Sequence, residues 1–249
     1  MDSPEPAAVP PVRDAAADRL IRNPSRARTV KEYRDLQIPT ALEDLLRPAS
    51  VALVVYDMQV GICRQIQEAP AITAKISKLL ESARRAGVRT AFTRHMSLPK
   101  DWMGVAQFRM GMGWQRVDDP SQVQPWFLRD SSNVSIVPEL QPQPSEAVFD
   151  KVTMSAFEGT PLSIALRDCG VSSVIFAGIA MEVGIEPSCR HAADLGFVPI
   201  LAADACGHGN AEAASRSVEA LRFSGDTVVS DAETICGILD ACAPRPEAP

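Results

Sequence analysis

Three short segments of the chain carry side chains that could do chemistry together. Asp57 follows an apolar run, Lys151 ends a second strand-like segment, and Gly184 stands where a third apolar run gives way to a helical pattern. Open α/β sheets bind their ligands at the edge where parallel strands end. A carboxylate such as Asp57 needs a partner there, because burying an unpaired charge costs several kcal/mol. We therefore expect the functional site at this edge.

The elements that must position these residues alternate regularly between strand and helix. Strands are predicted over 51–56, 88–93, 147–149, 173–178, 197–202 and 227–230, and helices over 70–86, 160–169, 184–195, 210–223 and 231–242. A continuous apolar strand is typical of a parallel sheet that is buried on both faces. The alternation predicts right-handed crossovers and a three-layer α/β/α domain with a mainly parallel, about six-stranded Rossmann-like sheet.

The predicted organisation is one hydrolase-sized domain with an arm and a tail. Residues 1–45 form an N-terminal arm, extended or partly helical with a short helix at 40–46; the domain spans 46–243, and 244–249 are a tail. An insertion at about 96–145 is long for a connection and contains Trp102, Trp114 and Trp126. This aromatic content disfavours disorder, so we expect the insertion to cover the substrate, to contact another copy of the chain, or both.

Composition narrows the class of partner. The net charge of −6 is spread along the chain without a basic cluster, so nucleic acid is not an expected partner. No apolar stretch approaches the roughly 20 residues of a membrane span, and the N-terminus has no secretory pattern, which predicts a cytoplasmic protein. Six cysteines lack CxxC spacing and three histidines lie far apart, so neither a metal nor another cofactor is predicted. A small neutral or anionic metabolite is the expected ligand.

The segments Val-Val-Tyr-Asp57-Met-Gln, Phe-Asp-Lys151-Val-Thr-Met and Gly178-Ile-Ala-Met-Glu-Val-Gly184 occur in this order along the chain. Together they resemble the isochorismatase-like hydrolase superfamily, the cysteine hydrolase fold, over about residues 50–235. The resemblance implies that Asp57 and Lys151 face one another in the pocket. In most members, the sixth residue after the strand-ending glycine is a cysteine that attacks an amide or imide carbonyl. This chain has Gly184 in that place.

Gly184 admits three interpretations. Isochorismatases proper also carry a glycine here and cleave an enol ether without a covalent intermediate, which is the most specific model for this chain. In this model Asp57 would be the acid/base and Lys151 its electrostatic partner. Alternatively another side chain replaces the thiol, although Cys189 lies about 1.4 helical turns further along and should point elsewhere. The third interpretation is a non-catalytic metabolite-binding or assembly protein on the same fold.

The resemblance also implies further properties of the site and of the assembly. We expect a cis peptide bond at Ala180–Met181, a homodimer or higher homo-oligomer, and a role in secondary metabolism. Independently of the resemblance, the small Gly184 at the start of a helix should leave backbone N–H groups free to hold a carboxylate or water. The metal-binding motif of the nicotinamidase branch is not reproduced in residues 93–99. Thr160 is expected to cap a helix with Pro161 at its first position. The expected substrate-binding residues are Gln59, Arg94, Trp114, Phe157 and Met181, with Arg116 as a second choice after Arg94 for substrate charge.

Overall fold

The computed structural model describes residues 30–244, and the chain divides into two units after Asp44. Most of the predicted arm, residues 1–29, lies outside the described residues. What is described of the first unit is an antiparallel hairpin of β1 (Val30–Tyr33) and β2 (Leu36–Pro39), which the sequence did not predict. The turn between them places Arg34 in the left-handed region at φ 54°. The helix predicted at 40–46 is the short α1 (Leu42–Leu45).

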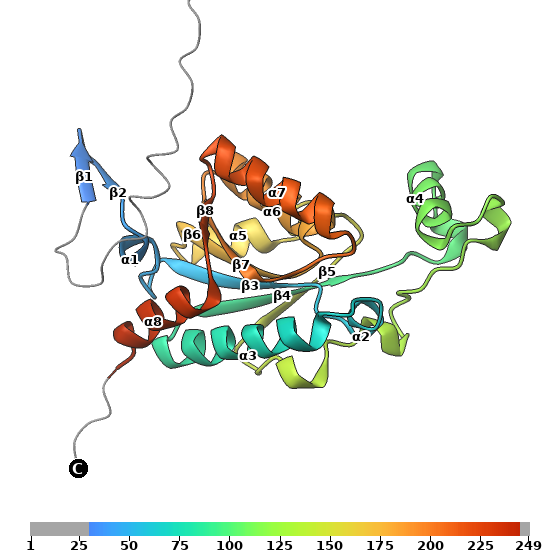
Figure 1. The fold of residues 1–249 in the computed structure, drawn as a ribbon, viewed down its shortest axis with the longest axis horizontal. Coiled ribbons are helices and arrows are strands. Elements are labelled where there is room, and N and C mark those ends of the chain that lie inside the picture. The colour runs from blue at the N-terminus through green and yellow to red at the C-terminus, as the bar shows by residue number, and fades with distance from the viewer. Residues whose placement is uncertain (1–29, 245–249) are drawn as a thin grey trace, which may run out of the picture. The chain divides into compact units, whose positions relative to one another are not determined.

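The second unit is built on a six-stranded parallel sheet, as predicted. Its strand order is β5-β4-β3-β6-β7-β8 (Figure 1). The two central strands, β3 and β6, are buried along their whole length, which explains their unbroken apolar sequences. The bounds are β3 (Val51–Tyr56), β4 (Arg89–His95), β5 (Ala147–Lys151), β6 (Ser173–Ile179), β7 (Val198–Gly207) and β8 (Val228–Ser230).

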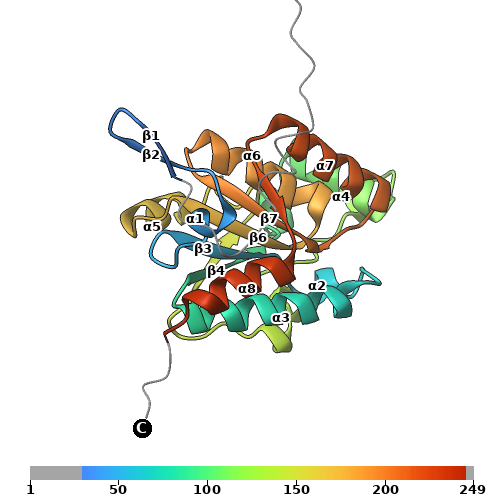
Figure 2. The ribbon, with the colours of Figure 1, turned by 60° about the vertical axis from the view of Figure 1, so that its left-hand side comes forward.

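Helices cover both faces of this sheet and complete the predicted three layers. α3 and α8 pack side by side on one face, and α5, α6 and α7 lie on the other (Figures 1 and 2). α3 buries the apolar face that its periodicity predicted and ends at Gly87, whose φ of 73° suits a glycine cap. The bounds are α2 (Val60–Cys63), α3 (Ala69–Ala86), α5 (Leu162–Asp168), α6 (Glu186–Asp194), α7 (Ala211–Ser224) and α8 (Ala232–Cys242).

Two local boundaries differ from the sequence prediction. The helix expected at 160–169 begins at Leu162 with Pro161 as its N-cap residue, so the assignment of Thr160 as cap was wrong by one position. The Thr160 hydroxyl nevertheless accepts a hydrogen bond from the Leu162 N–H at 3.3 Å. β7 continues five residues beyond its predicted end at 202, after a shift in its register against β6.

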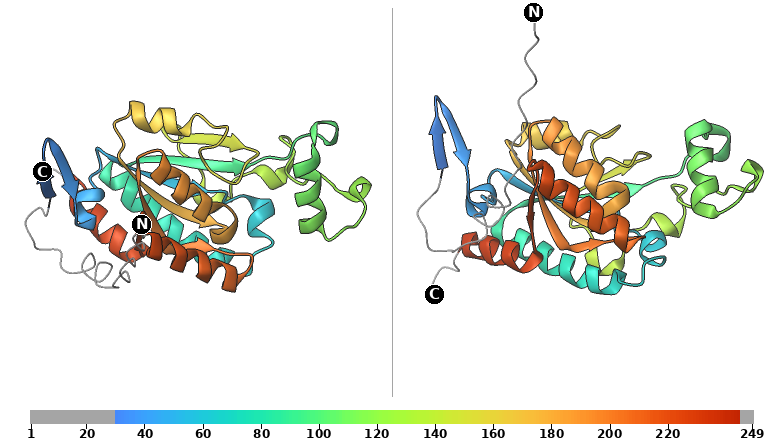
Figure 3. Two further views of the ribbon diagram at one scale, coloured as in Figure 1. Left: turned by 90° about the horizontal axis from the view of Figure 1, so that it is seen from above. Right: turned by 45° about the horizontal axis from the view of Figure 1, so that its top comes forward.

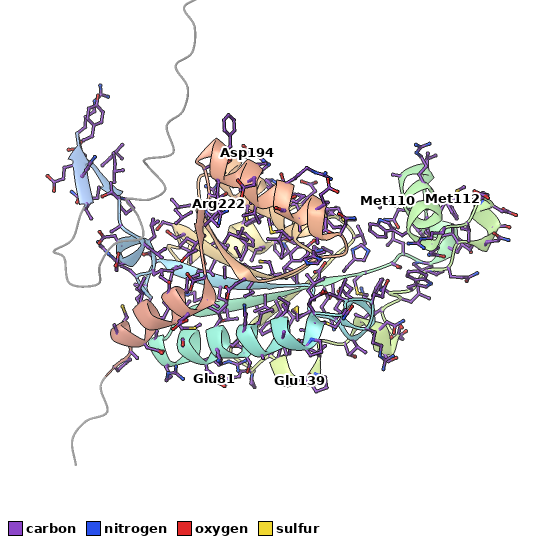
Figure 4. All side chains as sticks on the ribbon, viewed as in Figure 1. Glu81, Met110, Met112, Glu139, Asp194 and Arg222 are labelled. Carbon is purple, nitrogen blue, oxygen red and sulfur yellow. The ribbon has the colours of Figure 1, made fainter. Side chains whose placement is uncertain are left out.

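The aromatic insertion contains a helix that was not predicted, α4 (Val105–Gln115). It lies beyond the carboxyl ends of the strands (Figures 1 and 3), and none of its residues is buried. Figure 4 labels Met110 and Met112 on this helix. The returning segment is fixed to the chain after β4, because the N–H of Ser97 donates to the Phe127 carbonyl at 2.9 Å and the Phe127 N–H donates to the Ser97 hydroxyl.

Candidate active site

The strand order places the candidate site at the point where the sheet changes direction. The chain runs from β3 outward through β4 to β5, then returns to the other side of β3 with β6 and continues to β8. Such a switch leaves a crevice outside the carboxyl ends of the two strands that flank it. Here the flanking strands are β3 and β6, so Asp57 and the turn that contains Gly184 lie at the same crevice.

Asp57 and Lys151 form the buried ion pair that the resemblance implied. The Lys151 ammonium donates to Asp57 Oδ2 at 2.6 Å, and the exposed fractions of the two side chains are 0% and 5%. The Thr93 hydroxyl donates to the other carboxylate oxygen, also at 2.6 Å. Burial lowers the pKa of Lys151, and the neighbouring Asp57 opposes that shift. Each charge therefore has the partner that its burial requires.

The backbone at Asp57 is strained. Its φ of 47° lies in the left-handed region, which non-glycine residues seldom adopt, although aspartate tolerates it better than most. The Asp57 N–H donates to the Thr93 hydroxyl at 3.2 Å, so the same threonine holds both the backbone and the carboxylate. Strained residues that the surroundings hold in place occur often at functional sites. This geometry turns the Asp57 side chain toward Lys151 at the end of β3.

The phenol of Tyr56 fills the space beside Gly184. A Cβ atom built on Gly184 would lie 1.9 Å from the Tyr56 hydroxyl oxygen and 2.3 Å from its Cζ. The hydroxyl accepts a hydrogen bond from the Lys151 ammonium at 2.8 Å and donates to the Met154 carbonyl. Burial and the nearby Asp57 raise the pKa of Tyr56 well above its ordinary value, so the phenol is neutral. Where a cysteine side chain would stand, the chain has a buried neutral hydroxyl.

The turn that carries Gly184 is a π-helical turn, Met181–Ile185, which leads directly into α6. The N–H groups of Val183, Gly184 and Ile185 all point to the Ala180 carbonyl, at 3.0–3.3 Å. The expectation of a free N–H at Gly184 was therefore wrong, because the wide turn uses it internally. The predicted cis peptide was displaced by one residue: the cis bond joins Ile179 to Ala180.

No cysteine replaces the missing thiol at this position. Cys189 is fully buried on α6, where burial raises the pKa of its thiol well above the ordinary value. Burial likewise raises the pKa of Cys206 to about 12 and that of Cys63 to about 11. Reactive cysteines need the thiolate, which these surroundings disfavour.

Two of the expected substrate-binding residues have other partners in the structure. The Gln59 side chain is fully buried; its amide oxygen accepts from the His95 N–H at 2.6 Å, and its Nε2 donates to the carbonyls of His95 and Val134. Arg94 forms a two-pronged ion pair with Asp150 at 2.7 and 3.0 Å. Successive strand residues point to opposite faces, so Arg94 faces away from Thr93 and the ion pair.

The remaining expected residues divide between the core and the surface. Met181 and Phe157 belong to the core cluster, and Phe157 stacks on Phe197 with ring centroids 5.9 Å apart. Arg116 is exposed at the end of α4. Trp114 is half exposed and its ring meets the His95 ring at 6.4 Å. Of the five residues nominated for substrate binding, Trp114 alone combines an exposed side chain with a contact near the ion pair.

Comparison with known proteins identifies the family of this chain. The Isochorismatase domain model matches residues 51–233. The chain belongs to the isochorismatase family. It is 28% identical over 219 residues to the ureidoacrylate amidohydrolase RutB of Agrobacterium fabrum, covering 80% of this chain and 94% of that protein. RutB of Rhizobium rhizogenes is 29% identical over 179 residues, or 66% and 72% of the two chains.

A solved structure shares the fold. A cysteine hydrolase from Pseudomonas syringae pv. phaseolicola superposes with a TM-score of 0.68 at 22% identity, covering 88% of this chain and 99% of that one. The fold and the family of this chain are therefore those of a hydrolase. In this chain the site combines Tyr56 with Gly184.

Sequence reasoning missed the position of His95 beside the ion pair of this isochorismatase-family site. His95 is the last residue of β4 and the register partner of Lys151 on β5. Phe127 and Trp114 from the insertion pack edge-to-face against its ring, at centroid distances of 5.7 and 6.4 Å. The signal was available in the sequence, because His95 lies two positions after Thr93 and so shares its face of the sheet. The sequence analysis considered the histidines only as metal ligands and therefore did not use this signal.

Two glutamates lie two positions before and after Gly184. Glu182 Oε1 accepts from the N–H groups of Gly209 and Asn210 at the start of α7, at 2.7 and 2.8 Å. Glu186 pairs with Arg190 and accepts from the Ser217 hydroxyl. These carboxylates fasten the turn of the site to α7.

A cavity of 660 Å³ lies where β5 ends. Its volume falls in the range of small-molecule sites. Its walls come from the ends of β5, the segment after β4, the returning insertion and the loop before α5; Lys151 is the member of the ion-pair cluster that lines it. Within residues 30–244, no group of three or more metal-ligating side chains was found, and no helix is long and apolar enough to cross a membrane.

Proposed function

We propose that this protein hydrolyses a small metabolite by direct attack of water, without a covalent bond between enzyme and substrate. The observation that supports this proposal is the Tyr56 phenol in the space next to Gly184. No thiol lies there, and the neutral phenol, with its raised pKa, is a poor nucleophile. Asp57 and Lys151 supply fixed charges at the reacting centre, where buried electrostatic groups act most strongly.

The first substrate class is an isochorismate-like enol ether, which the glycine at position 184 favours through the resemblance to isochorismatases proper. This reaction needs a proton delivered to the enol carbon before water attacks. Both carboxylate oxygens of Asp57 already accept hydrogen bonds, from Thr93 and Lys151. Asp57 is therefore arranged as an acceptor, and it would act as an acid only after exchanging one of these bonds for the substrate.

The second substrate class is an amide of the ureido type. It is favoured by the names of the relatives, which are ureidoacrylate amidohydrolases at 28% and 29% identity. In this reaction the acceptor geometry of Asp57 needs no rearrangement. The carboxylate can accept a hydrogen bond from the attacking water and so orient it, while the Lys151 ammonium stabilises the negative charge that develops on the carbonyl oxygen.

Hydrolysis assays with both classes test the proposal. Purified protein is incubated with isochorismate or with ureidoacrylate. The formation of pyruvate is measured for the first compound, and the release of ammonia for the second. Asp57→Asn is expected to lower turnover by ~10²–10⁴-fold with an unchanged circular dichroism spectrum. Asp240→Asn makes the same chemical change in the ion pair of α8 with Arg85, outside the lining of the cavity, and is expected to keep turnover. Mass spectrometry of the quenched reaction is expected to show unmodified enzyme.

Three outcomes would argue against this function. A mass adduct on the enzyme would show covalent catalysis. If Asp57→Asn were as active as wild type, the Asp57–Lys151 ion pair would not be part of the mechanism. Inactivity of wild type toward both classes, combined with saturable binding of either compound, would favour a non-catalytic metabolite-binding protein.

We further propose that the chain forms a homodimer or higher homo-oligomer. The insertion exposes the large apolar side chains of Trp102 and Val105, at 77% and 79%. Groups of exposed apolar side chains often mark protein contacts. Light scattering coupled to size exclusion tests this, and a monomeric mass would contradict it. The cytoplasmic location and a place in secondary metabolism are predictions from sequence.

A further inference from the structure

The His95 imidazole lies beside the buried ion pair. β4 and β5 are parallel, and His95 and Lys151 are opposite one another in their register. Register partners in a sheet point to the same face, as do Thr93 and His95 within β4. The charges of Asp57 and Lys151 both act on the ring: burial lowers the pKa of His95, Asp57 raises it and Lys151 lowers it. Arg94 and Asp150, on the other face, pair with each other.

Contacts on both sides of His95 fix its position. The Gln59 amide bonds both the N–H and the carbonyl of His95, at 2.6 and 3.0 Å, in the manner of a neighbouring strand. The ring is held by the edge-to-face contacts with Phe127 and Trp114. Neither set of contacts uses the ring nitrogens. The structure thus orients an imidazole without occupying its polar atoms.

The hydrogen-bonding capacity of the neighbours is already in use. The Lys151 ammonium has three protons, and it donates to Tyr56, to Asp57 and to the Thr153 carbonyl at 3.1 Å. The Tyr56 hydroxyl proton goes to Met154. In contrast, the ring nitrogens of the half-buried His95 have no hydrogen-bond partner among residues 30–244. Of the titratable groups in this cluster, His95 is the one with free polar atoms and an exposed surface.

We propose that His95 is a catalytic residue that carries the proton between water and substrate in the hydrolysis. This inference rests on the proposed function. In amide hydrolysis, the neutral imidazole takes a proton from water as the new C–O bond forms. The imidazolium then returns that proton to the leaving nitrogen as the C–N bond breaks.

In enol-ether hydrolysis, the same group works in the opposite order. The imidazolium gives its proton to the enol carbon, and the resulting oxocarbenium ion is attacked by water. The neutral imidazole takes one proton from that water, which leaves a neutral hemiketal and restores the imidazolium. The imidazolium then gives this proton to the leaving alcohol oxygen as its C–O bond breaks, and the imidazole takes the hemiketal hydroxyl proton as the C=O bond forms. Protons and electron pairs balance in both sequences, and neither needs a further co-reactant. Asp57 and Lys151 keep their ion pair throughout.

The kinetic test compares wild type with His95→Gln and His95→Phe. The phenylalanine variant retains the ring packing against Phe127 and Trp114 while removing both nitrogens. Both variants are expected to lose ~10²–10⁴-fold in kcat with a small change in KM. Wild-type kcat/KM is expected to depend on one ionisation, whose pKa lies below that of an ordinary histidine. With rising pH, kcat/KM should increase for an amide substrate and decrease for an enol ether. This limb is expected to be absent from both variants. His208→Gln is the matched control and should retain activity.

A second measurement tests the placement of His95 without activity. The chain has three histidines, so the His95 ring signal in an NMR titration is identified by its loss in His95→Gln. Asp57→Asn should lower the pKa of His95 further, because it removes the charge that raises it. Lys151→Met should raise that pKa, since it removes an opposing positive charge.

The outcomes separate this inference from the proposed function. Wild type that hydrolyses neither substrate class would refute the function and with it the catalytic role. Active wild type with an equally active, folded His95→Phe variant and an unchanged pH profile would refute the role of His95 alone. A His95 signal that is indifferent to both Asp57→Asn and Lys151→Met would overturn the placement itself.

Discussion

Replacing Gly184 by alanine should destabilise the protein through Tyr56. The new Cβ would lie 1.9 Å from the Tyr56 hydroxyl oxygen, 2.3 Å from Cζ and 2.6 Å from Cε1. Carbon atoms in contact normally stay about 3.5–4.0 Å apart, so the phenol has to move by well over 1 Å. Tyr56 is 2% exposed and is held at its tip by Lys151 and Met154. Such a movement breaks the hydrogen bond to the Lys151 ammonium.

The expected loss follows from these two effects. Forcing an extra methyl group into a packed core costs ~1–3 kcal/mol. Losing a hydrogen bond to a charged group costs a further ~1.5–3 kcal/mol. Alanine recovers ~0.5–1 kcal/mol relative to glycine in helical backbone. The net loss of unfolding free energy is therefore about 2–5 kcal/mol, and Tm falls by about 4–20 °C at 2–4 °C per kcal/mol for a domain of this size.

Urea denaturation and calorimetry of four variants measure this effect. Gly237→Ala is the control, because nothing lies within 4 Å of a Cβ at this exposed position in α8, and it should gain ~0.5–1 kcal/mol. Tyr56→Val alone should lose ~3–5 kcal/mol to a cavity. The double variant with Gly184→Ala should lose less than the sum of the single variants by at least about 1 kcal/mol. The proposed steric conflict would be refuted if Gly184→Ala were as stable as Gly237→Ala. It would also be refuted if the stability losses of Gly184→Ala and Tyr56→Val simply added up in the double variant.

Further predictions concern the thiols, the phenol and the charged pair outside the site. Hydrolysis should survive iodoacetamide at pH 7, because burial raises the pKa of Cys206 to about 12 and leaves Cys189 as a thiol; loss of activity after alkylation would implicate a cysteine. Since the pKa of Tyr56 is raised in the folded protein, its contribution to stability is complete below the unfolded phenol value of about 10 and is lost as pH rises through the folded value. Alkaline unfolding curves of wild type and Tyr56→Phe should therefore converge toward high pH, and parallel curves would contradict this. Arg94→Gln should leave KM unchanged and alter stability by less than ~1 kcal/mol, because its partly exposed ion pair faces away from Asp57. A large rise in KM for Arg94→Gln would place the substrate on the opposite face.

The sheet was predictable because its strands are long, apolar and regularly spaced. The hairpin β1–β2 was not, since its strands are largely exposed and have no buried face to impose a pattern. α4 was not predicted for a similar reason. It buries no residue, and Gly111 and Gly113 weaken its helical propensity. Local sequence thus predicts elements that bury one face and misses those that do not.

The contacts of the candidate site differ in how far the sequence could predict them. The contact of Asp57 with Lys151 was anticipated through the family resemblance, and both residues lie at the carboxyl ends of strands of one parallel sheet. The orientation of Arg94 could have been predicted from strand alternation alone. The meeting of Tyr56 with Gly184 could not, because the two residues are 128 positions apart and their contact depends on the pairing of β3 with β6 and on the width of the π-helical turn. Such a contact is a property of the assembled sheet.

The occupied space beside Gly184 also limits the evolutionary routes open to this chain. A single mutation to cysteine at position 184 would collide with Tyr56, and a single mutation that shortens Tyr56 would leave a cavity and deprive Lys151 of a partner. Passage between this site and a thiol-bearing one therefore requires two changes, each of them harmful alone. Sign epistasis of this kind would isolate lineages with the Tyr56–Gly184 combination from the cysteine enzymes of the same fold, and would let each group diverge in chemistry on a shared scaffold.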